Sequence, residues 1–214
     1  MVTAASRIYR TSPGDLPFKP GESPFKTKGN AYNSLKAFHA TQVPGGVAAV
    51  ADALDPDLRA FYSQTFLAAG WYDFLPMQLL EKVAISIVGL DSATFLRRLG
   101  LHVVERDMKG VHKLLLHFTS PEAAIKRFSG VFRQYYNFGA SRVVASEPGH
   151  SELEQDGMPR ISAPVYQGVA AAFAQRLIEL AGATNVTVEN TPFEPCGVEH
   201  GLTLVRWRAI TRWR

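Results

Sequence analysis

The chain has little cysteine and no long apolar run. Its 214 residues include one cysteine, Cys196, which cannot form an internal disulfide, so the sequence favours a cytoplasmic protein. No run of about 18 apolar residues occurs, so no helix is expected to cross a membrane. The first residues also lack the basic start and apolar stretch of a secretory signal. We therefore expect a globular, cytoplasmic protein.

The motifs of common catalytic sites are also missing. Neither glycine-rich phosphate-binding pattern is present, and the serine-hydrolase motif Gly-x-Ser-x-Gly does not occur. Glu199-His200 has no second histidine one helical turn away, as a metalloprotease would need. Cys196 and His200 could form a thiolate–imidazole pair, but a lone cysteine near a strand is more typical of a packed small side chain. The sequence predicts neither an enzyme nor a metal site.

The net charge of +4 is concentrated at the two ends of the chain. Residues 1–30 carry five basic and two acidic side chains, and the last nine residues carry four arginines and no acid. Basic ends could contact nucleic acid or an anionic surface. However, the sequence has no basic patch interleaved with aromatic residues and no recognisable nucleic-acid-binding motif. We interpret these ends as an aid to solubility and do not expect a nucleic-acid partner.

Prolines and glycines dominate the start of the chain. Residues 1–27 hold four prolines, and proline lacks the amide donor that helices and central strands require. This composition predicts an extended arm. Phe18 and Phe25 are expected to attach the arm to the body of the protein or to a partner chain.

Helical signals dominate residues 28–138. Tyr32, Leu35 and Phe38 are spaced so that they share one helical face. Capping residues and apolar spacing predict further helices after Asp55-Pro56, from Met77 to Gly89, after Asp91-Ser92 and after Ser120-Pro121. The segment 111–118 has helical spacing, yet it is short and fits a strand equally well.

Residues 139–214 have a different pattern, which predicts β-β-α-β-β. The expected strands are Ala140–Ser146, Met158–Ala163, Asn185–Glu189 and Gly201–Arg214, around a helix that ends at Gly182. A polar connection is expected between the first two strands. Helices followed by strands indicate an α+β protein with one antiparallel sheet. We expect the arm, the helical part and the sheet part to form one compact unit.

Aromatic residues gather at the ends of two predicted helices. One group is Trp71-Tyr72-Asp73-Phe74, and the other is Tyr135-Tyr136-Asn137-Phe138. Such clusters line pockets in many proteins, but they also fill cores. The candidate pocket residues are Tyr62, Trp71, Tyr72, His102, Phe132, Tyr135 and Tyr136.

Three histidines lie close together in the sequence, at His102, His112 and His117. Their spacing does not place His112 and His117 on one face of a helix or of a strand, so a metal site is poorly supported. An axial heme ligand needs only one histidine, which keeps these three as weak candidates. Heme is therefore an alternative cofactor that the sequence does not favour.

From Lys28 onward, several short stretches follow one another in a suggestive order. They are Gly29-Asn-Ala-Tyr-Asn-Ser-Leu35, Trp71-Tyr-Asp-Phe-Leu-Pro76, Gly89-Leu-Asp-Ser-Ala-Thr-Phe-Leu-Arg-Arg-Leu-Gly100, Tyr166-Gln-Gly168, Ala181-Gly-Ala183, and Cys196-Gly197 with the strand of Trp207. The layout resembles the superfamily of heme–NO-binding sensor domains and 4-vinyl reductase-type small-molecule-binding domains. Within it, the sequence is most similar to a paralogous family of myxobacterial proteins of similar length.

The resemblance implies an N-terminal helical subdomain packed on a ββαββ antiparallel-sheet roll, with a ligand cavity between them. Heme–NO sensors carry a histidine in the helix before the sheet and a Tyr-x-Ser-x-Arg motif. Here the matching helix, Ser120–Tyr136, has no histidine, and Ala140-Ser141-Arg142 is only a fragment of that motif. Vinyl-reductase-type domains use clustered cysteines, and this chain has one.

The expected function is therefore a non-enzymatic sensor or regulatory domain that binds an apolar small molecule and signals through a homodimer or a regulatory protein partner. Two alternatives stay open. One is a protein–protein interaction module without a ligand, and the other is a heme protein that uses His102, His112 or His117.

Overall fold

The structure is a computed structural model that describes residues 8–109 and 120–214. The chain divides into two compact units, of which the first ends at Phe95 and the second begins at Leu96. Helices and antiparallel strands occur in both, so the predicted α+β class is confirmed. The division at residues 27/28 and 138/139 that the sequence suggests stays a prediction. No helix of the described chain is long and apolar enough to cross a membrane.

The first unit is mainly helical. Its elements are β1 (Lys26–Lys28), α1 (Gly29–Gln42), α2 (Gly46–Asp52), α3 (Pro56–Ser63), β2 (Trp71–Asp73) and α4 (Pro76–Val88). α5 (Ser92–Lys109) begins at its end and continues into the second unit. β1 pairs with β2 in antiparallel register. Buried aromatic rings make much of the core, and Tyr32 stacks on Phe66 with ring centroids 4.3 Å apart.

The helix ends that the sequence predicts from capping residues are confirmed for three helices of the two units. The Asp55 carboxylate accepts the N–H of Leu58 at 3.1 Å, and Pro56 occupies the first turn of α3. Ser120 caps α6 (Pro121–Tyr135) in the same way, because its hydroxyl accepts the N–H of Ala123 at 3.2 Å. Gly89 ends α4 with a φ of 73°, a backbone conformation that favours glycine.

The proline-rich segment, which the sequence predicts to be an extended arm, packs against the rest of the first unit from residue 8 onward. The N–H of Thr11 donates to the carbonyl of Ala53, and its hydroxyl donates to Asp55 at 2.9 Å. Farther along, Asp73 accepts the N–H groups of Gly21 and Ser23. Phe25 is buried, and Phe18 is half-buried. Phe25 thus attaches this segment to the body of the chain.

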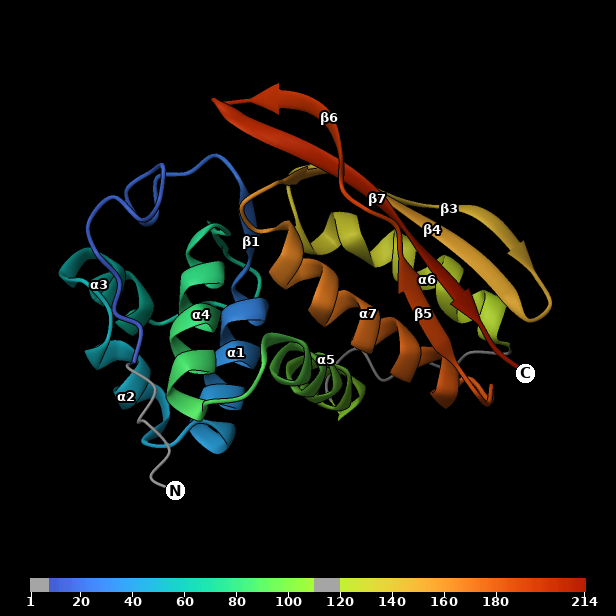
Figure 1. The fold of residues 1–214 in the computed structure, drawn as a ribbon, viewed down its shortest axis with the longest axis horizontal. Coiled ribbons are helices and arrows are strands. Elements are labelled where there is room, and N and C mark those ends of the chain that lie inside the picture. Colours follow the sequence, from blue (N-terminus) through green and yellow to red (C-terminus); the bar gives the residue numbers. More distant parts are fainter. Residues whose placement is uncertain (1–7, 110–119) are drawn as a thin grey trace, which may run out of the picture. The chain divides into compact units, whose positions relative to one another are not determined.

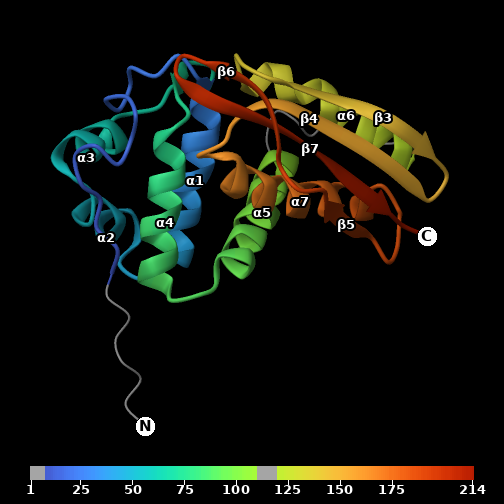
Figure 2. The ribbon, with the colours of Figure 1, turned by 45° about the horizontal axis from the view of Figure 1, so that its top comes forward.

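The second unit is a sheet with helices on one face (Figure 1; Figure 2). The strands are β3 (Ala140–Glu147), β4 (His150–Pro159), β5 (Thr187–Asn190), β6 (Glu194–Glu199) and β7 (Leu202–Arg212). The order is β3-β4-β7-β5, and β6 also pairs with β7; all the pairs are antiparallel. α6 and α7 (Ala163–Leu180) cover the same face. α5 approaches α7 so closely that a β-carbon at Gly100 would lie 2.5 Å from the carbonyl oxygen of Val169.

Two sequence-based expectations about the sheet are wrong in detail. Residues 150–157 belong to β4, where a polar connection and a strand at Met158–Ala163 were expected, and β6 is an additional strand. These residues of β4 do not look like a strand in the sequence because many of them are charged. The charged ones lie on the face of the sheet opposite α6 and α7, where charged residues pair with one another. Glu154 accepts from Arg142 and, at 3.3 Å, from Arg208, and Arg208 also pairs with Glu152 at 3.4 Å. A strand with such a face looks like a loop in sequence.

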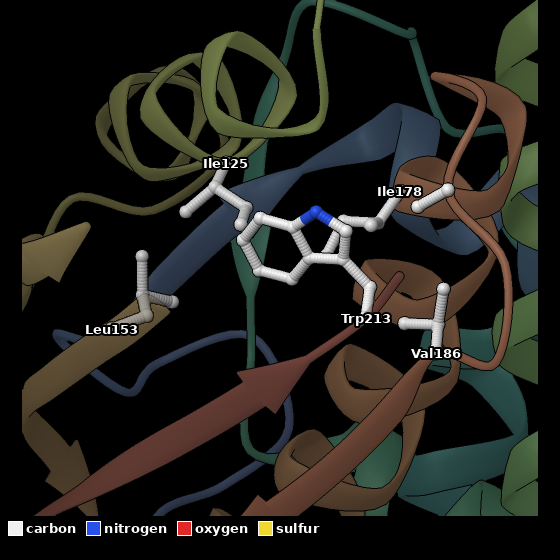
Figure 3. Close-up of a cluster of buried hydrophobic side chains, with 6 residues drawn as sticks. Ile125, Leu153, Ile178, Val186 and Trp213 are labelled. Carbon is white, nitrogen blue, oxygen red and sulfur yellow. The ribbon is translucent and has the colours of Figure 1, made fainter. Parts of the chain in front are cut away.

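One hydrophobic cluster closes the end of the second unit (Figure 3). It comprises Ile125, Leu153, Ile178, Ala183, Val186 and Trp213. The indole of Trp213 lies between side chains from α6, β4 and α7, directly after the end of β7 (Figure 3). The cluster therefore joins both helices to the sheet at this point.

Candidate functional site

A hollow lies inside the second unit, between α6 and α7 and the inner face of the sheet; we call it the sheet pocket. Its volume is about 530 Å³ when the open mouth is counted. Its enclosed volume is only about 30 Å³, which is room for about two waters. The sheet pocket is thus a narrow slot rather than a wide cavity.

Three rows of paired side chains form the floor of the sheet pocket. In the register of β4 and β7, Ser151 faces Thr211, Leu153 faces Ala209, and Gln155 faces Trp207. These residues are two apart along each strand, and alternate side chains of a strand share one face. The charged residues between them, including Glu152 and Arg208, therefore lie on the opposite face.

Small residues of α7 form the roof. Ala170, Ala171 and Ala174 lie on the helix face that lines the slot, whereas Leu177 and Ile178 follow one turn later. Alanine leaves space that a leucine at the same place would fill. Phe128 of α6 lines the side, and its ring stacks on Phe173 with centroids 5.2 Å apart. The slot exists because the middle of α7 is alanine-rich.

Aromatic residues bound the other part of the slot. Tyr166 and Trp207 both line it, and their ring centroids are 5.9 Å apart. Tyr166 also contacts Tyr136 at 5.6 Å and Phe132 at 6.0 Å in edge-to-face geometry. Burial, with a smaller effect from Tyr136, raises the pKa of Tyr166 well above its usual value, so this phenol stays neutral.

One polar group of the slot lacks a partner. Ser151 is 1% exposed, and its hydroxyl finds no hydrogen-bond partner among the described residues. Leaving a buried hydroxyl unpaired costs about 1–3 kcal/mol. Gln155, by contrast, donates its amide to the carbonyl of Ala140 at 3.0 Å. All the residues that line the slot are uncharged.

The structure distributes the seven predicted pocket residues over both units. In the first unit, Tyr62 is buried, Trp71 is 46% exposed beneath the ammonium of Lys28, and the hydroxyl of Tyr72 accepts the N–H of Leu67. In the second unit, His102 is half-buried on α5, and Tyr135, the last residue of α6, is also half-buried.

Two of these residues, Phe132 and Tyr136, are in ring contact. Their rings stack with centroids 4.7 Å apart, next to Tyr166. None of the seven belongs to the lining of the sheet pocket. His112 and His117 lie outside the described residues, as does the ambiguous segment 111–118. Sequence reasoning missed the alanines at 170, 171 and 174 of α7 and the lining residues of β4, which are Ser151, Leu153 and Gln155.

A second polar cluster is buried in the first unit. The Nδ1 of His39 lies 2.8 Å from the hydroxyl of Tyr62, and its Nε2 lies 3.9 Å from Glu81 Oε2. All three side chains are buried. Burial raises the pKa of Glu81, and His39 lowers it by less. Burial, followed by the charge of Glu81, also raises the pKa of Tyr62.

Neither cluster has the ligand set of a metal centre. Within residues 8–109 and 120–214, no group of three or more histidine, cysteine or acidic side chains could hold a metal ion. Cys196 is half-buried on β6, where burial and a contact with Asp156 raise the pKa of its thiol. A thiol of this kind is a weak nucleophile near neutral pH.

Comparison with known proteins identifies the fold. No family model matches the chain, and no curated protein matches it. Among solved structures, an unliganded Fe(II) H-NOX protein from K. algicida is similar with a TM-score of 0.60 and 12% identity, over 87% of this chain and 96% of that one. An oxygen-binding H-NOX domain related to soluble guanylate cyclases has a TM-score of 0.56 and 9% identity, over 87% and 92%. The resemblance to the heme–NO-binding fold is therefore confirmed, while the similarity to a myxobacterial family stays a prediction.

Proposed function

We propose that the chain is a non-enzymatic sensor or regulatory domain that binds an apolar small molecule in the sheet pocket. The observation that carries this proposal is a slot of uncharged side chains that contains a buried serine hydroxyl without a partner in the described chain. Apolar walls with a few placed polar groups are typical of small-molecule sites. The likeness to an oxygen-binding H-NOX domain adds that this fold is used for ligand binding.

Binding in the slot would act on the contact between helix and sheet. α7 meets the floor through alanines, so the pocket interrupts the packing between this helix and β4 and β7. A bound molecule would fill that gap and stabilise the bound arrangement by mass action. We infer that the stabilised unit then contacts a second copy of the chain or a regulatory protein. Light scattering of the purified chain, with and without a bound molecule, tests the homodimer.

The proposal is tested by mass spectrometry of the intact purified chain under native conditions. We expect a co-purified mass that the Ala174→Leu variant loses, because leucine fills the roof of the slot. Ala93→Leu is the matched control, since Ala93 is exposed on α5, and this variant should keep the mass. An empty wild-type chain that small apolar probes also fail to stabilise would favour the alternative, an interaction module without a ligand.

Heme is the second candidate, because the similar structures include an Fe(II) H-NOX protein. His102 offers an imidazole on α5, but α6, the helix directly before the sheet, carries no histidine. The Tyr-x-Ser-x-Arg motif is absent, and Arg142 of its fragment pairs with Glu154. The residues present therefore do not fit the heme set that the resemblance implies.

A spectrum separates the heme candidate from the proposal. The purified chain is expected to be colourless. A Soret band that survives gel filtration in the wild type and disappears in His102→Ala would replace the proposal by heme binding. A cytoplasmic location, expected from the lone Cys196, belongs to the same proposal and is checked by cell fractionation.

A further inference from the structure

We propose that the molecule bound in the sheet pocket is uncharged, has a small apolar body of about the size of two waters, and carries a hydrogen-bond acceptor for the Ser151 hydroxyl. This inference rests on the proposed function and specifies the ligand of the same site. Three features of the slot lead to it: the absence of charge in its lining, the state of Ser151, and its volume.

The charge of the sheet is confined to the face opposite the pocket. Glu152, Glu154 and Asp156 alternate along β4 with the lining residues, and they pair with Arg208, Arg142 and Arg206. The lining itself holds alanines, aliphatic and aromatic side chains, and a few neutral polar groups. A carboxylate or an ammonium in the slot would lose its hydration without gaining a counter-ion. The pocket therefore selects a neutral molecule.

The hydroxyl of Ser151 defines where the polar group of that molecule lies. Ser151 is in register with Thr211 and shares its face with Leu153, so its side chain enters the slot from the floor. A hydroxyl can donate and accept, but an unpaired donor is the rarer and costlier state inside a protein. A carbonyl or ether oxygen of the ligand would accept this proton. The polar end of the ligand is thus placed beside Ser151 and its apolar body beside Leu153 and Ala209.

The volume limits the size of the apolar body. Ala170 and Ala174 of the roof and Ala209 and Leu153 of the floor line the slot, and its enclosed volume is only about 30 Å³. A cavity that holds a benzene ring is about five times larger. A molecule of about four heavy atoms meets these requirements, and it supplies simple probes.

The test uses three probes of similar size with the full chain at about pH 7. Acetone carries an acceptor, 2-methylpropene has the same shape but lacks it, and acetate is an anion at this pH. Ligand-observed NMR titrations measure their dissociation constants. We expect acetone to bind about 3- to 10-fold more tightly than 2-methylpropene, the effect of one hydrogen bond. Acetate should show no saturable binding.

Two serine variants make the assignment specific. Ser151→Ala should remove the preference for acetone over 2-methylpropene while leaving 2-methylpropene binding unchanged. Ser146→Ala is the matched control, because Ser146 is the register partner of Ser151 in the β3–β4 hairpin but is exposed. This variant should keep the preference.

The outcomes separate this inference from the proposed function. Binding of all three probes with equal affinity, or a preference that persists in Ser151→Ala, overturns the neutral acceptor ligand but keeps the pocket. Binding that Ala174→Leu does not weaken places the probes elsewhere and overturns both. The same holds if none of the probes binds to the wild-type chain.

Discussion

The Nδ1 atom of His39 and the hydroxyl oxygen of Tyr62 lie 2.8 Å apart inside the first unit, where neither side chain reaches solvent. One residue comes from α1 and the other from α3, so this contact links two helices. A buried hydrogen bond between helices fixes their relative position, because breaking it leaves polar atoms without water.

Replacement of Tyr62 by phenylalanine should destabilise the first unit by about 1–3 kcal/mol, because His39 then loses the partner of its Nδ1. Tyr9→Phe is the control. It also removes a hydroxyl, which donates to Asp15, but at an exposed site, where the loss should stay within about 0.5 kcal/mol. Denaturant unfolding followed by circular dichroism measures both. Equal losses in the two variants would contradict a structural role for the buried contact.

The buried carboxyl of Glu81 should make the stability of the first unit depend on pH. Its pKa is raised in the folded chain above the ordinary 4.5, so the folded state holds the proton more tightly than the unfolded state. The contribution of this group is therefore fully present below about pH 4.5 and is lost as the pH rises through the folded pKa. The slope cannot exceed about 1.4 kcal/mol per pH unit for one proton.

Hydrogen exchange of α1 and α4 between about pH 4.5 and 7.5 measures this dependence, after correction for intrinsic exchange rates. Wild type should lose protection relative to Glu81→Gln as the pH rises, because glutamine does not titrate. Glu22→Gln, at an exposed position, should follow the wild type. A difference between wild type and Glu81→Gln that stays flat or grows in favour of the wild type would refute the prediction.

Two glycine substitutions in helices should have opposite effects. A β-carbon at Gly100 would lie 2.5 Å from the carbonyl oxygen of Val169 and 2.7 Å from the β-carbon of Ala172. Gly100→Ala should therefore cost about 1–3 kcal/mol by forcing α5 away from α7. A β-carbon at Gly130 meets nothing within 4 Å, so Gly130→Ala should stabilise α6 by about 0.5–1 kcal/mol. Thermal unfolding distinguishes the two. A Gly100→Ala variant as stable as the wild type would contradict the close α5–α7 approach, and a destabilised Gly130→Ala would contradict the open space at Gly130.

Removal of the Asp73 carboxylate should release the proline-rich segment. This buried group accepts the N–H groups of Gly21, Ser23 and Leu75 at 3.0, 3.2 and 3.0 Å. Asp73→Ala leaves these donors unpaired and should cost about 2–4 kcal/mol. Hydrogen exchange should rise most at residues 21–25, whereas the exposed Asp57→Ala should leave them protected. Unchanged exchange at residues 21–25 in Asp73→Ala would show that other contacts hold the segment.

The helices were predictable because their ends carry local signals. Asp55 and Ser120 cap their helices through the hydrogen bonds that their sequence positions imply, and Gly89 and Gly182 have the positive φ expected of helix ends. These contacts span only a few residues. A single sequence is therefore enough to locate them.

The sheet and the pocket depend on partners far apart in the chain. Residues 150–157 read as a polar connection, since nothing near them shows that Glu154 would be neutralised by Arg142 and Arg208. The slot likewise requires Ser151 of β4 to lie beneath the alanines of α7. Neither pairing is encoded locally, so neither could be found before the fold was known.

The ion pairs on the outer face of the sheet change the meaning of the basic C-terminus. Arg206, Arg208 and Arg212 are each matched by a carboxylate from β4 or β5, so most of the positive charge in the last nine residues is already compensated inside the same domain. A polyanion approaching this strand would have to compete with carboxylates of the chain for the guanidinium groups of these three arginines. These arginines thus stabilise the pairing of neighbouring strands in the sheet. The uncompensated positive charge of the chain lies mainly on other segments.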